Sequence, residues 1–178
     1  MKLIGVIGEP ATGKTTLLRY VLQRLGNDYQ PFKFGRLLYG RQYKGGLYVL
    51  GIYADNETFG GTDRLSMAVQ PVAIRFLNKV PTNAVVLFEG DRLTRVGFLG
   101  AAGRDRLRLF LVEASPQEKL RRHRARRDTQ SVQFHRSRAT LIRRISDTFP
   151  VDRLRNETTA DLRANADRVM RALPVATP

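Results

Sequence analysis

The chain has 178 residues, with 31 Lys and Arg against 16 Asp and Glu, a formal net charge of +15. This length is typical of one folded domain, and an apolar content of 42% excludes a disordered basic tail. The absence of cysteine excludes disulfides, thiolate metal sites and thiol nucleophiles, and two histidines leave no zinc constellation. No apolar run approaches the roughly 20 residues of a membrane span. We expect a cytoplasmic protein with a polyanionic partner, nucleic acid before a membrane surface or phosphorylated small molecules; charge that only aids solubility is the alternative.

The first third of the chain alternates between strand-like and helix-like patterns. Residues 3–7 are continuously apolar and predict a buried strand. Apolar residues recur on one face of a predicted helix over residues 14–25. Residues 32–39 and 47–53 are rich in aromatic and β-branched side chains, and the turn-like stretch 40–46 between them predicts a hairpin.

The middle of the chain predicts a long helix followed by two strands. Thr62 or Asp63 can cap a helix that runs to about residue 79, and Pro71 should kink it. The apolar stretches 84–88 and 107–112 then predict two further buried strands.

The last third predicts three helices. Ser115, Pro116 and Glu118 have the spacing of a helix cap, a proline in the first helical position and the acid of a capping box. Further helices are expected over residues 138–145 and 160–173. The alternation of strands and helices along the whole chain predicts an α/β fold with a largely parallel sheet.

A glycine-rich loop follows the first predicted strand and matches the pattern G-x-x-x-x-G-K-[ST]. Such a loop turns backbone N–H groups inward around phosphates, and the helix behind it presents its positive N-terminus. Lys14 would reach the β- and γ-phosphates of a nucleoside triphosphate such as ATP, and the Thr15 hydroxyl would bind Mg²⁺. The predicted nucleotide-binding residues are Gly8, Glu9, Pro10, Ala11, Thr12, Gly13, Lys14, Thr15 and Thr16.

The loop alone does not separate a kinase from an ATPase or a GTPase. The chain has no N-K-x-D guanine motif and is too short for a second nucleotide-binding domain, so a small phosphotransferase is the economical interpretation. Such an enzyme needs a metal-organising acid, a base for the acceptor hydroxyl and cations for the phosphoryl group.

Candidates for the acid follow the predicted strand at residues 84–88. Glu89 or Asp91 would lie beside the phosphate loop and help to hold Mg²⁺, and Arg92 could contact a phosphate. The alternative is an ion pair between Asp91 and Arg92 that closes a turn.

Two aspartates are candidates for the base. Asp55 follows a predicted strand directly, and Asp63 follows the glycine pair 60–61 and precedes Arg64. We prefer Asp63, because the glycines permit a close backbone approach to a substrate and Arg64 supplies a partner charge. An ordinary helix cap is the alternative role for Asp63.

The positive charge is concentrated in two tracts. Residues 119–144 hold ten Lys and Arg against one Asp, and they lie where a closing lid, residues 116–146, would be found in a small kinase. Arg122 and Arg126 are our candidates to clamp the transferring phosphoryl group. Residues 29–54 hold four cations, no acid and several aromatic side chains, which suits nucleic-acid backbone contacts and base stacking.

These features together resemble the nucleoside and nucleotide kinase group of P-loop proteins, over nearly the whole chain. The resemblance implies one P-loop kinase domain over residues 1–178, with a five-stranded parallel sheet in the order 2-3-1-4-5. It also implies that the loop at residues 155–158 contacts adenine.

More narrowly, residues 59–71, preceded by the stretch 49–53, resemble bacteriophage 5-hydroxymethyluracil DNA kinases. This implies phosphorylation, with ATP and Mg²⁺, of the hydroxymethyl group of the modified pyrimidine within DNA. A kinase of free deoxynucleosides or nucleoside monophosphates and a nucleic-acid-stimulated ATPase are the alternatives. The matching motif residues are Gly61, Thr62, Asp63, Arg64 and Gln70.

Overall fold

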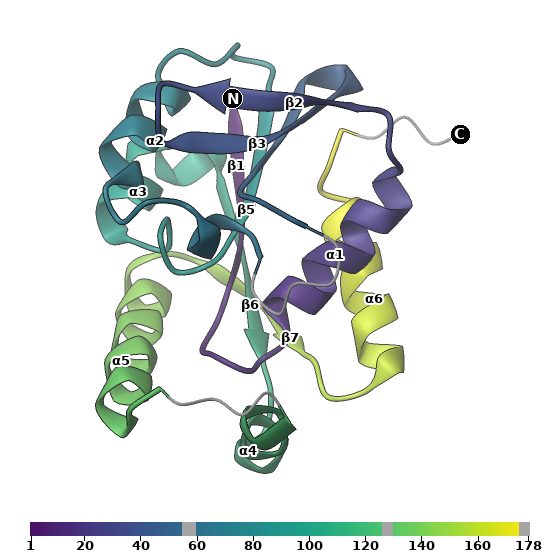
Figure 1. Cartoon of the computed structure of the whole chain (residues 1–178), viewed down its shortest axis with the longest axis vertical. Coiled ribbons are helices and arrows are strands. Elements are labelled where there is room, and N and C mark those ends of the chain that lie inside the picture. The colour runs from purple at the N-terminus through teal and green to yellow at the C-terminus, as the bar shows by residue number, and fades with distance from the viewer. Residues whose placement is uncertain (55–59, 126–129, 175–178) are drawn as a thin grey trace.

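A computed structural model describes residues 1–54, 60–125 and 130–174, and in these ranges it shows an α/β fold built on one seven-stranded mixed sheet (Figure 1). The strand order is β2-β3-β4-β5-β1-β6-β7. The strands are β1 (Lys2–Ile7), β2 (Tyr29–Phe34), β3 (Leu38–Tyr43), β4 (Leu47–Leu50), β5 (Val85–Glu89), β6 (Leu107–Glu113) and β7 (Val151–Arg155).

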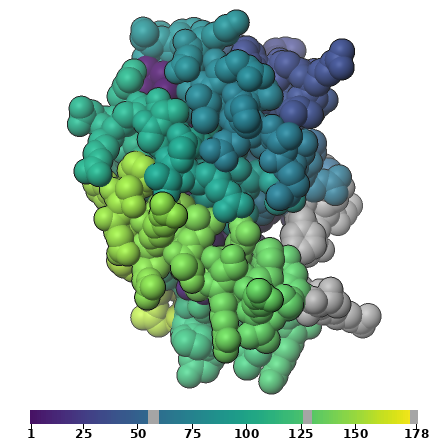
Figure 2. Space-filling view, turned by 90° about the vertical axis from the view of Figure 1, so that its left-hand side faces the viewer, coloured from purple at the N-terminus to yellow at the C-terminus, as the bar shows by residue number. Residues whose placement is uncertain are grey.

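Helices cover both faces of the sheet. α1 (Lys14–Leu25) and α6 (Thr159–Met170) pack together on one face, and α2 (Val69–Leu77), α3 (Val96–Ala101) and α5 (Val132–Thr148) lie on the other (Figure 1). In Figure 2 the light green surface of α5 lies directly below the teal surface around α3. α4 (Pro116–Ala125) lies beyond the end of the sheet where the phosphate loop turns. Within the described residues, no helix is long and apolar enough to cross a membrane.

The expectation of five parallel strands is corrected to a larger, mixed sheet. β4, β5, β1, β6 and β7 pair in parallel, and β2 and β3 add two antiparallel strands beyond β4. The expected hairpin also has other boundaries. The chain turns at residues 35–37, where Gly35 has a φ of 60°, and most of the expected turn at 40–46 is strand β3. Glycine tolerates this φ, so a strand predicted across Gly35 divides into two.

The helix expected from Thr62 to about residue 79 is also corrected. Residues Thr62–Arg64 form a single 3-10 turn, and α2 begins only at Val69. The break arises because the Thr62 hydroxyl donates a hydrogen bond to the Glu89 carbonyl (2.7 Å), which holds this segment against the end of β5. Pro71 consequently lies in the first turn of α2, where proline disrupts no helical hydrogen bond and causes no kink.

The last third contains a strand that the sequence pattern did not indicate, and one cap that differs. β7 pairs with β6 although three of its five residues are charged, as suits a strand at the sheet edge. At α4 the Ser115 hydroxyl accepts a hydrogen bond from the Glu118 N–H (3.3 Å) as expected. The expected capping box does not close, because the Ser115 N–H donates to Glu157 instead (2.8 Å).

The central strand β1 fixes the position of the phosphate loop. Leu3, Ile4, Val6 and Ile7 have no exposed surface and face both helical layers. Burial of side chains of this size stabilises the fold by about 1.5–3 kcal/mol each. The carboxyl end of β1 is therefore held rigidly between β5 and β6, and ligands of open α/β sheets bind at this edge.

Candidate active site

The predicted phosphate loop connects β1 to α1, as the motif requires. Two of its glycines have no room for a side chain. A Cβ at Gly8 (φ 150°) would lie 2.4 Å from the Val112 carbonyl oxygen, and one at Gly13 (φ 94°) would lie 2.4 Å from Asn156 Nδ2. The loop backbone therefore lies close against its surroundings, in a form suited to wrapping phosphates.

Side chains from distant parts of the chain hold this loop. The Arg122 guanidinium donates to the Ala11 carbonyl (3.2 Å), and Asn156 Nδ2 donates to the Thr12 carbonyl (2.8 Å). Lys119 forms an ion pair with Glu9 (2.9 Å). Asn156 is buried and was missed by the sequence reasoning, since one asparagine more than 140 residues from the loop carries no motif.

Within the loop, Lys14 folds over the backbone. Its Nζ donates to the Glu9 carbonyl (2.8 Å), and the Thr12 hydroxyl donates to the same oxygen (2.9 Å). The ammonium group thus lies over the loop, where it could reach the terminal phosphates of a bound triphosphate.

Thr15 and Glu89 form the pair expected to organise Mg²⁺. The Thr15 hydroxyl donates to Glu89 Oε1 (3.1 Å), and Glu89 is fully buried. Its other oxygen, Oε2, has no hydrogen-bond partner among the residues that the structure describes. Burial raises the pKa of Glu89 to about 8, Lys14 opposes this rise, and the Asp63 carboxylate adds to it.

The Thr15–Glu89 pair fits a magnesium ion. A hydroxyl and a buried carboxylate with an unsatisfied oxygen are hard oxygen ligands, and Mg²⁺ is usually held by one or two protein groups together with substrate phosphates and water. In the described ranges, no group of three or more His, Cys, Asp or Glu is arranged to hold a metal ion.

The raised pKa of Glu89 gives a testable pH dependence. Between pH 4.5 and about 8 the folded protein keeps a proton on Glu89 that the unfolded chain releases. The contribution of Glu89 to the free energy of unfolding is therefore fully present below pH 4.5. It decreases as pH rises from there and is lost once pH has passed about 8. In metal-free buffer, we expect the melting temperature of the wild type to fall relative to that of Glu89→Gln across this range. Parallel melting profiles of the two proteins would show that this assignment is wrong.

Asp63 and Asp91 lie together beyond the end of β5. Asp63 Oδ1 accepts a hydrogen bond from the Asp91 N–H (2.6 Å), and the Asp91 carboxylate pairs with Arg138 of α5 (3.4 Å). Burial and the nearby Asp91 carboxylate raise the pKa of Asp63. The ion pair between Asp91 and Arg92, the alternative to a metal-organising role, is not found among the described residues; Arg92 donates to the Leu65 carbonyl instead (3.4 Å).

The segment that carries Asp63 is held by Gly61. Gly61 forms two backbone hydrogen bonds with Ile52, of 2.9 and 3.0 Å, and a Cβ at Gly61 would lie 2.2 Å from Glu89 Oε1. We expected the glycine pair to approach a substrate, but Gly61 instead approaches the buried Glu89. Asp55, the alternative base, and Arg126, the second clamp candidate, lie outside the described residues.

A cavity of about 560 Å³ opens beside Asp63. Its walls bring together four arginines and two carboxylates, with Phe134 and Met67 as the apolar part. Arg138 lies over the Phe134 ring (5.1 Å to its centroid), and its buried Nε has no partner within the described ranges. The lining residues are Asp63, Arg64, Met67, Asp91, Arg92, Arg95, Gln130, Phe134 and Arg138. The cavity suits an anionic ligand with a flat or apolar part.

A second cavity, of about 300 Å³, lies on the other side of the phosphate loop. It is bounded by the loop, α4 and the start of α6, and it includes Gly13, Arg121, Asn156, Thr158 and Leu162. This is the place where the resemblance to nucleotide kinases puts the adenine of ATP, at residues 155–158.

Arg122, on α4, reaches the phosphate loop and the segment between β7 and α6. Besides the Ala11 carbonyl it contacts the Asn156 carbonyl (2.8 Å) and Glu118 (2.7 Å). We expect Arg122→Ala to weaken ATP binding roughly ten- to hundredfold, because the phosphate loop loses the hydrogen bond that holds it in shape. A hydrogen bond from a charged group stabilises a structure by about 1.5–3 kcal/mol. Arg124→Ala on the same helix, where the side chain is exposed, is the matched control. Titration calorimetry with ATP measures both, and equal affinities would contradict the role.

Comparisons with known proteins give distant structural similarities only. Neither a protein family nor a curated protein sequence matches the chain. The fold is similar to shikimate kinase from Bacteroides thetaiotaomicron, with 13% sequence identity, a TM-score of 0.48, and 98% of this chain and 99% of that chain covered. It is also similar to an uncharacterized protein from Eubacterium ventriosum, with 9% identity, a TM-score of 0.46, and coverage of 99% and 100%. At this distance neither neighbour assigns an acceptor to this chain.

Proposed function

We propose that this chain is a phosphotransferase that moves the γ-phosphoryl group of ATP, with Mg²⁺, to an acceptor hydroxyl. The observation that supports this best is the placement of three groups at one edge of the sheet. The phosphate loop with Lys14, the Thr15–Glu89 pair and Asp63 all lie at the carboxyl ends of β1 and β5. The arginine-lined cavity beside Asp63 is then the acceptor site.

The residues divide the work of the transfer between them. Backbone N–H groups of the loop and the Lys14 ammonium bind the phosphates, and Thr15 and Glu89 would hold the metal. Bound Mg²⁺ would neutralise charge on the β- and γ-phosphates. Asp63, held at Oδ1 by the Asp91 N–H, accepts the proton of the acceptor hydroxyl. The acceptor oxygen then bonds to the γ-phosphorus. At the same time the bond between the γ-phosphorus and the oxygen that bridges it to the β-phosphate breaks, and ADP leaves.

We propose the hydroxymethyl group of 5-hydroxymethyluracil in DNA as the acceptor. The resemblance of residues 59–71 to the phage DNA kinases, the net charge of +15 and the cationic cavity support this acceptor. Phe134 lines the cavity and supplies an aromatic face on which a base would stack.

A kinase of free nucleosides or nucleoside monophosphates is the second candidate. It is favoured by the same cavity, because a bounded space of about 560 Å³ lies in the range of small-molecule sites, and its four arginines could hold one phosphate.

The test is to incubate the protein with γ-labelled ATP and each of three acceptors: DNA containing 5-hydroxymethyluracil, the same DNA with thymine, and the free modified nucleoside or its monophosphate. We expect label in the modified DNA alone. Label only in the free compounds would favour the second candidate, and release of free phosphate alone would exclude both. Lys14→Ala is the control for a contaminating kinase, because it removes the phosphate-binding ammonium.

A further inference from the structure

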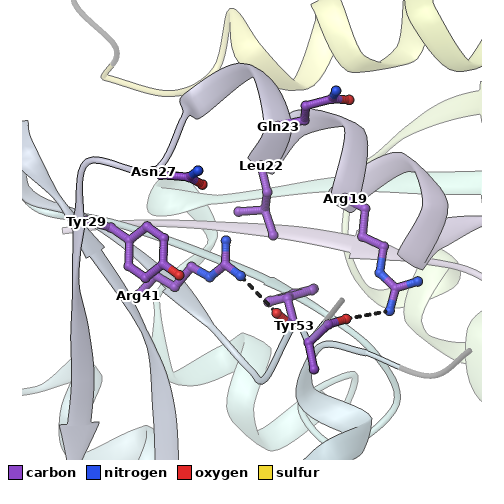
Figure 3. A pocket seen from close by; sticks show the side chains of 8 residues that line it. Arg19, Leu22, Gln23, Asn27, Tyr29, Arg41 and Tyr53 are labelled. Atoms are coloured by element: carbon purple, nitrogen blue, oxygen red, sulfur yellow. Dashed lines mark hydrogen bonds between the residues drawn. The ribbon is translucent and has the colours of Figure 1, made fainter. Parts of the chain in front are cut away.

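A cavity unrelated to the acceptor site lies between α1 and the antiparallel strands (Figure 3). Its volume is about 510 Å³, and it lies on the face of the sheet that α1 covers. The lining residues come from α1 and the turn after it, from the start of β2, from β3, and from the chain beyond β4. They are Arg19, Leu22, Gln23, Asn27, Tyr29, Arg41, Tyr53 and Ala54.

Arg41 stacks on Tyr29 in this cavity, and we call this stacked pair the Tyr29–Arg41 platform. The Arg41 guanidinium carbon lies 4.4 Å from the centroid of the Tyr29 ring and 5.9 Å from that of Tyr53. Its NH2 donates to the Tyr53 carbonyl (2.9 Å), which fixes the plane of the guanidinium. Figure 3 shows the Tyr29 ring and the Arg41 guanidinium next to each other below α1. Guanidinium and tyrosine planes of this kind are surfaces on which nucleobases stack.

The charge and polar groups of the cavity select an anionic ligand. Arg19 reaches in from α1 and donates to the Ala54 carbonyl (3.3 Å), so guanidiniums from α1 and from β3 line the same cavity. The exposed amides of Gln23 and Asn27 offer both donors and acceptors, which base edges require.

The cavity lies next to the catalytic edge of the sheet. A Cβ built at Gly60 would be 3.4 Å from the Tyr53 ring and 3.1 Å from the Thr15 side chain. Tyr53 therefore separates the cavity from the Thr15–Glu89 pair by the thickness of one side chain. A chain-like ligand seated here could continue toward the active site, whereas a compact one would gain nothing from this arrangement.

We propose that this cavity binds an unpaired nucleotide of a nucleic-acid strand, with the base stacked on the Tyr29–Arg41 platform and a backbone phosphate against Arg19. This site is separate from the acceptor cavity beside Asp63. It extends the proposed function, because a second contact would hold the polymer while one base is modified, but strand binding at this site does not itself require phosphoryl transfer.

The experiment measures binding of a fluorescent single-stranded DNA oligonucleotide by anisotropy, without ATP. Stacking contributes about 1–3 kcal/mol per base, so we expect Tyr29→Leu to weaken binding roughly five- to hundredfold, and Tyr29→Phe, which keeps the ring, to bind like the wild type. Arg19→Gln should weaken binding and reduce its salt dependence. Arg75→Gln, an exposed arginine on α2 across the sheet, is the charge-matched control and should change affinity less.

Three results would overturn the proposal. The first is an equal loss of DNA affinity in Arg19→Gln and Arg75→Gln, and the second is wild-type affinity in Tyr29→Leu. The third is that a free mononucleotide competes for the protein as strongly as the strand does. Melting temperatures of all variants show whether they are folded, and Tyr29→Phe remains informative if Tyr29→Leu is not. Failure of the proposed kinase activity would instead appear as absence of label transfer by the wild type, with its anisotropy unchanged.

Discussion

Asp63→Asn is expected to lower kcat for acceptor phosphorylation by roughly 10²–10⁴-fold, the usual contribution of a general base. Asparagine keeps a carbonyl oxygen that can accept the hydrogen bond from the Asp91 N–H, so the local backbone should be unchanged. The variant loses only the ability to take a proton. ATP affinity should consequently remain close to that of the wild type. Steady-state kinetics with saturating acceptor and ATP titration calorimetry measure the two quantities.

The matched control for this variant is Asp152→Asn. Asp152 lies on β7 in an ion pair with Arg108 (2.9 Å), away from the phosphate loop, and its loss should leave kcat unchanged. If Asp63→Asn keeps full activity while Asp55→Asn loses it, the base is Asp55. Equal activity of all three variants would show that no carboxylate of this pair accepts the proton.

Gly61→Ala is expected to have the largest combined effect on stability and activity. Gly61 has a φ of 72°, and a Cβ there would lie 2.2 Å from Glu89 Oε1 and 2.9 Å from the Glu89 carbonyl oxygen. The added methyl group must push the segment carrying Thr62 and Asp63 away from β5. Phosphoryl transfer should then fall at least as far as in Asp63→Asn, because both the base and the metal-organising acid are displaced.

Gly26→Ala isolates the steric part of this effect. Gly26 has nearly the same backbone conformation, with a φ of 76°, but a Cβ there would meet no atom within 4 Å. Both variants lose stability because alanine disfavours a positive φ. In Gly61→Ala the added methyl group also overpacks against Glu89, which lowers the free energy of unfolding by about 1–3 kcal/mol more. Chemical denaturation of the two variants measures this difference. Equal losses of stability would mean that Gly61 does not contact Glu89 as described.

The elements that the sequence predicted well are those whose signals are contiguous. The strand at residues 3–7, the glycine-rich loop and the helix Lys14–Leu25 follow one another directly, and each has a local physical cause in apolar periodicity or glycine conformation. The alternation of strands and helices similarly predicted an α/β fold. The adjacency of β1 and β5 then placed Glu89 beside Thr15, because the carboxyl ends of parallel strands share one edge.

The features that could not be predicted depend on contacts between distant residues. Asn156 supports the phosphate loop only because β7 pairs with β6, and β7 itself has no strong apolar pattern. The 3-10 turn at Thr62–Arg64 replaces helix because Thr62 bonds to Glu89, a contact across 27 positions. Arg122 was expected to clamp the transferring phosphoryl group, and in the structure it bonds to the carbonyls of Ala11 in the loop and of Asn156. Local patterns do not determine which long side chain reaches which carbonyl.

The most direct test of the proposed function is to locate the transferred phosphoryl group on the acceptor. DNA containing 5-hydroxymethyluracil is incubated with the protein, ATP and Mg²⁺, digested by nuclease to nucleoside monophosphates without phosphatase treatment, and examined by mass spectrometry. We predict a second phosphate, esterified to the hydroxymethyl oxygen of the base, on the modified nucleotide; it should be absent with Lys14→Ala and with thymine DNA. A phosphate found only at strand ends or only as inorganic phosphate would contradict the assignment of the Asp63 cavity as a site for the base hydroxyl.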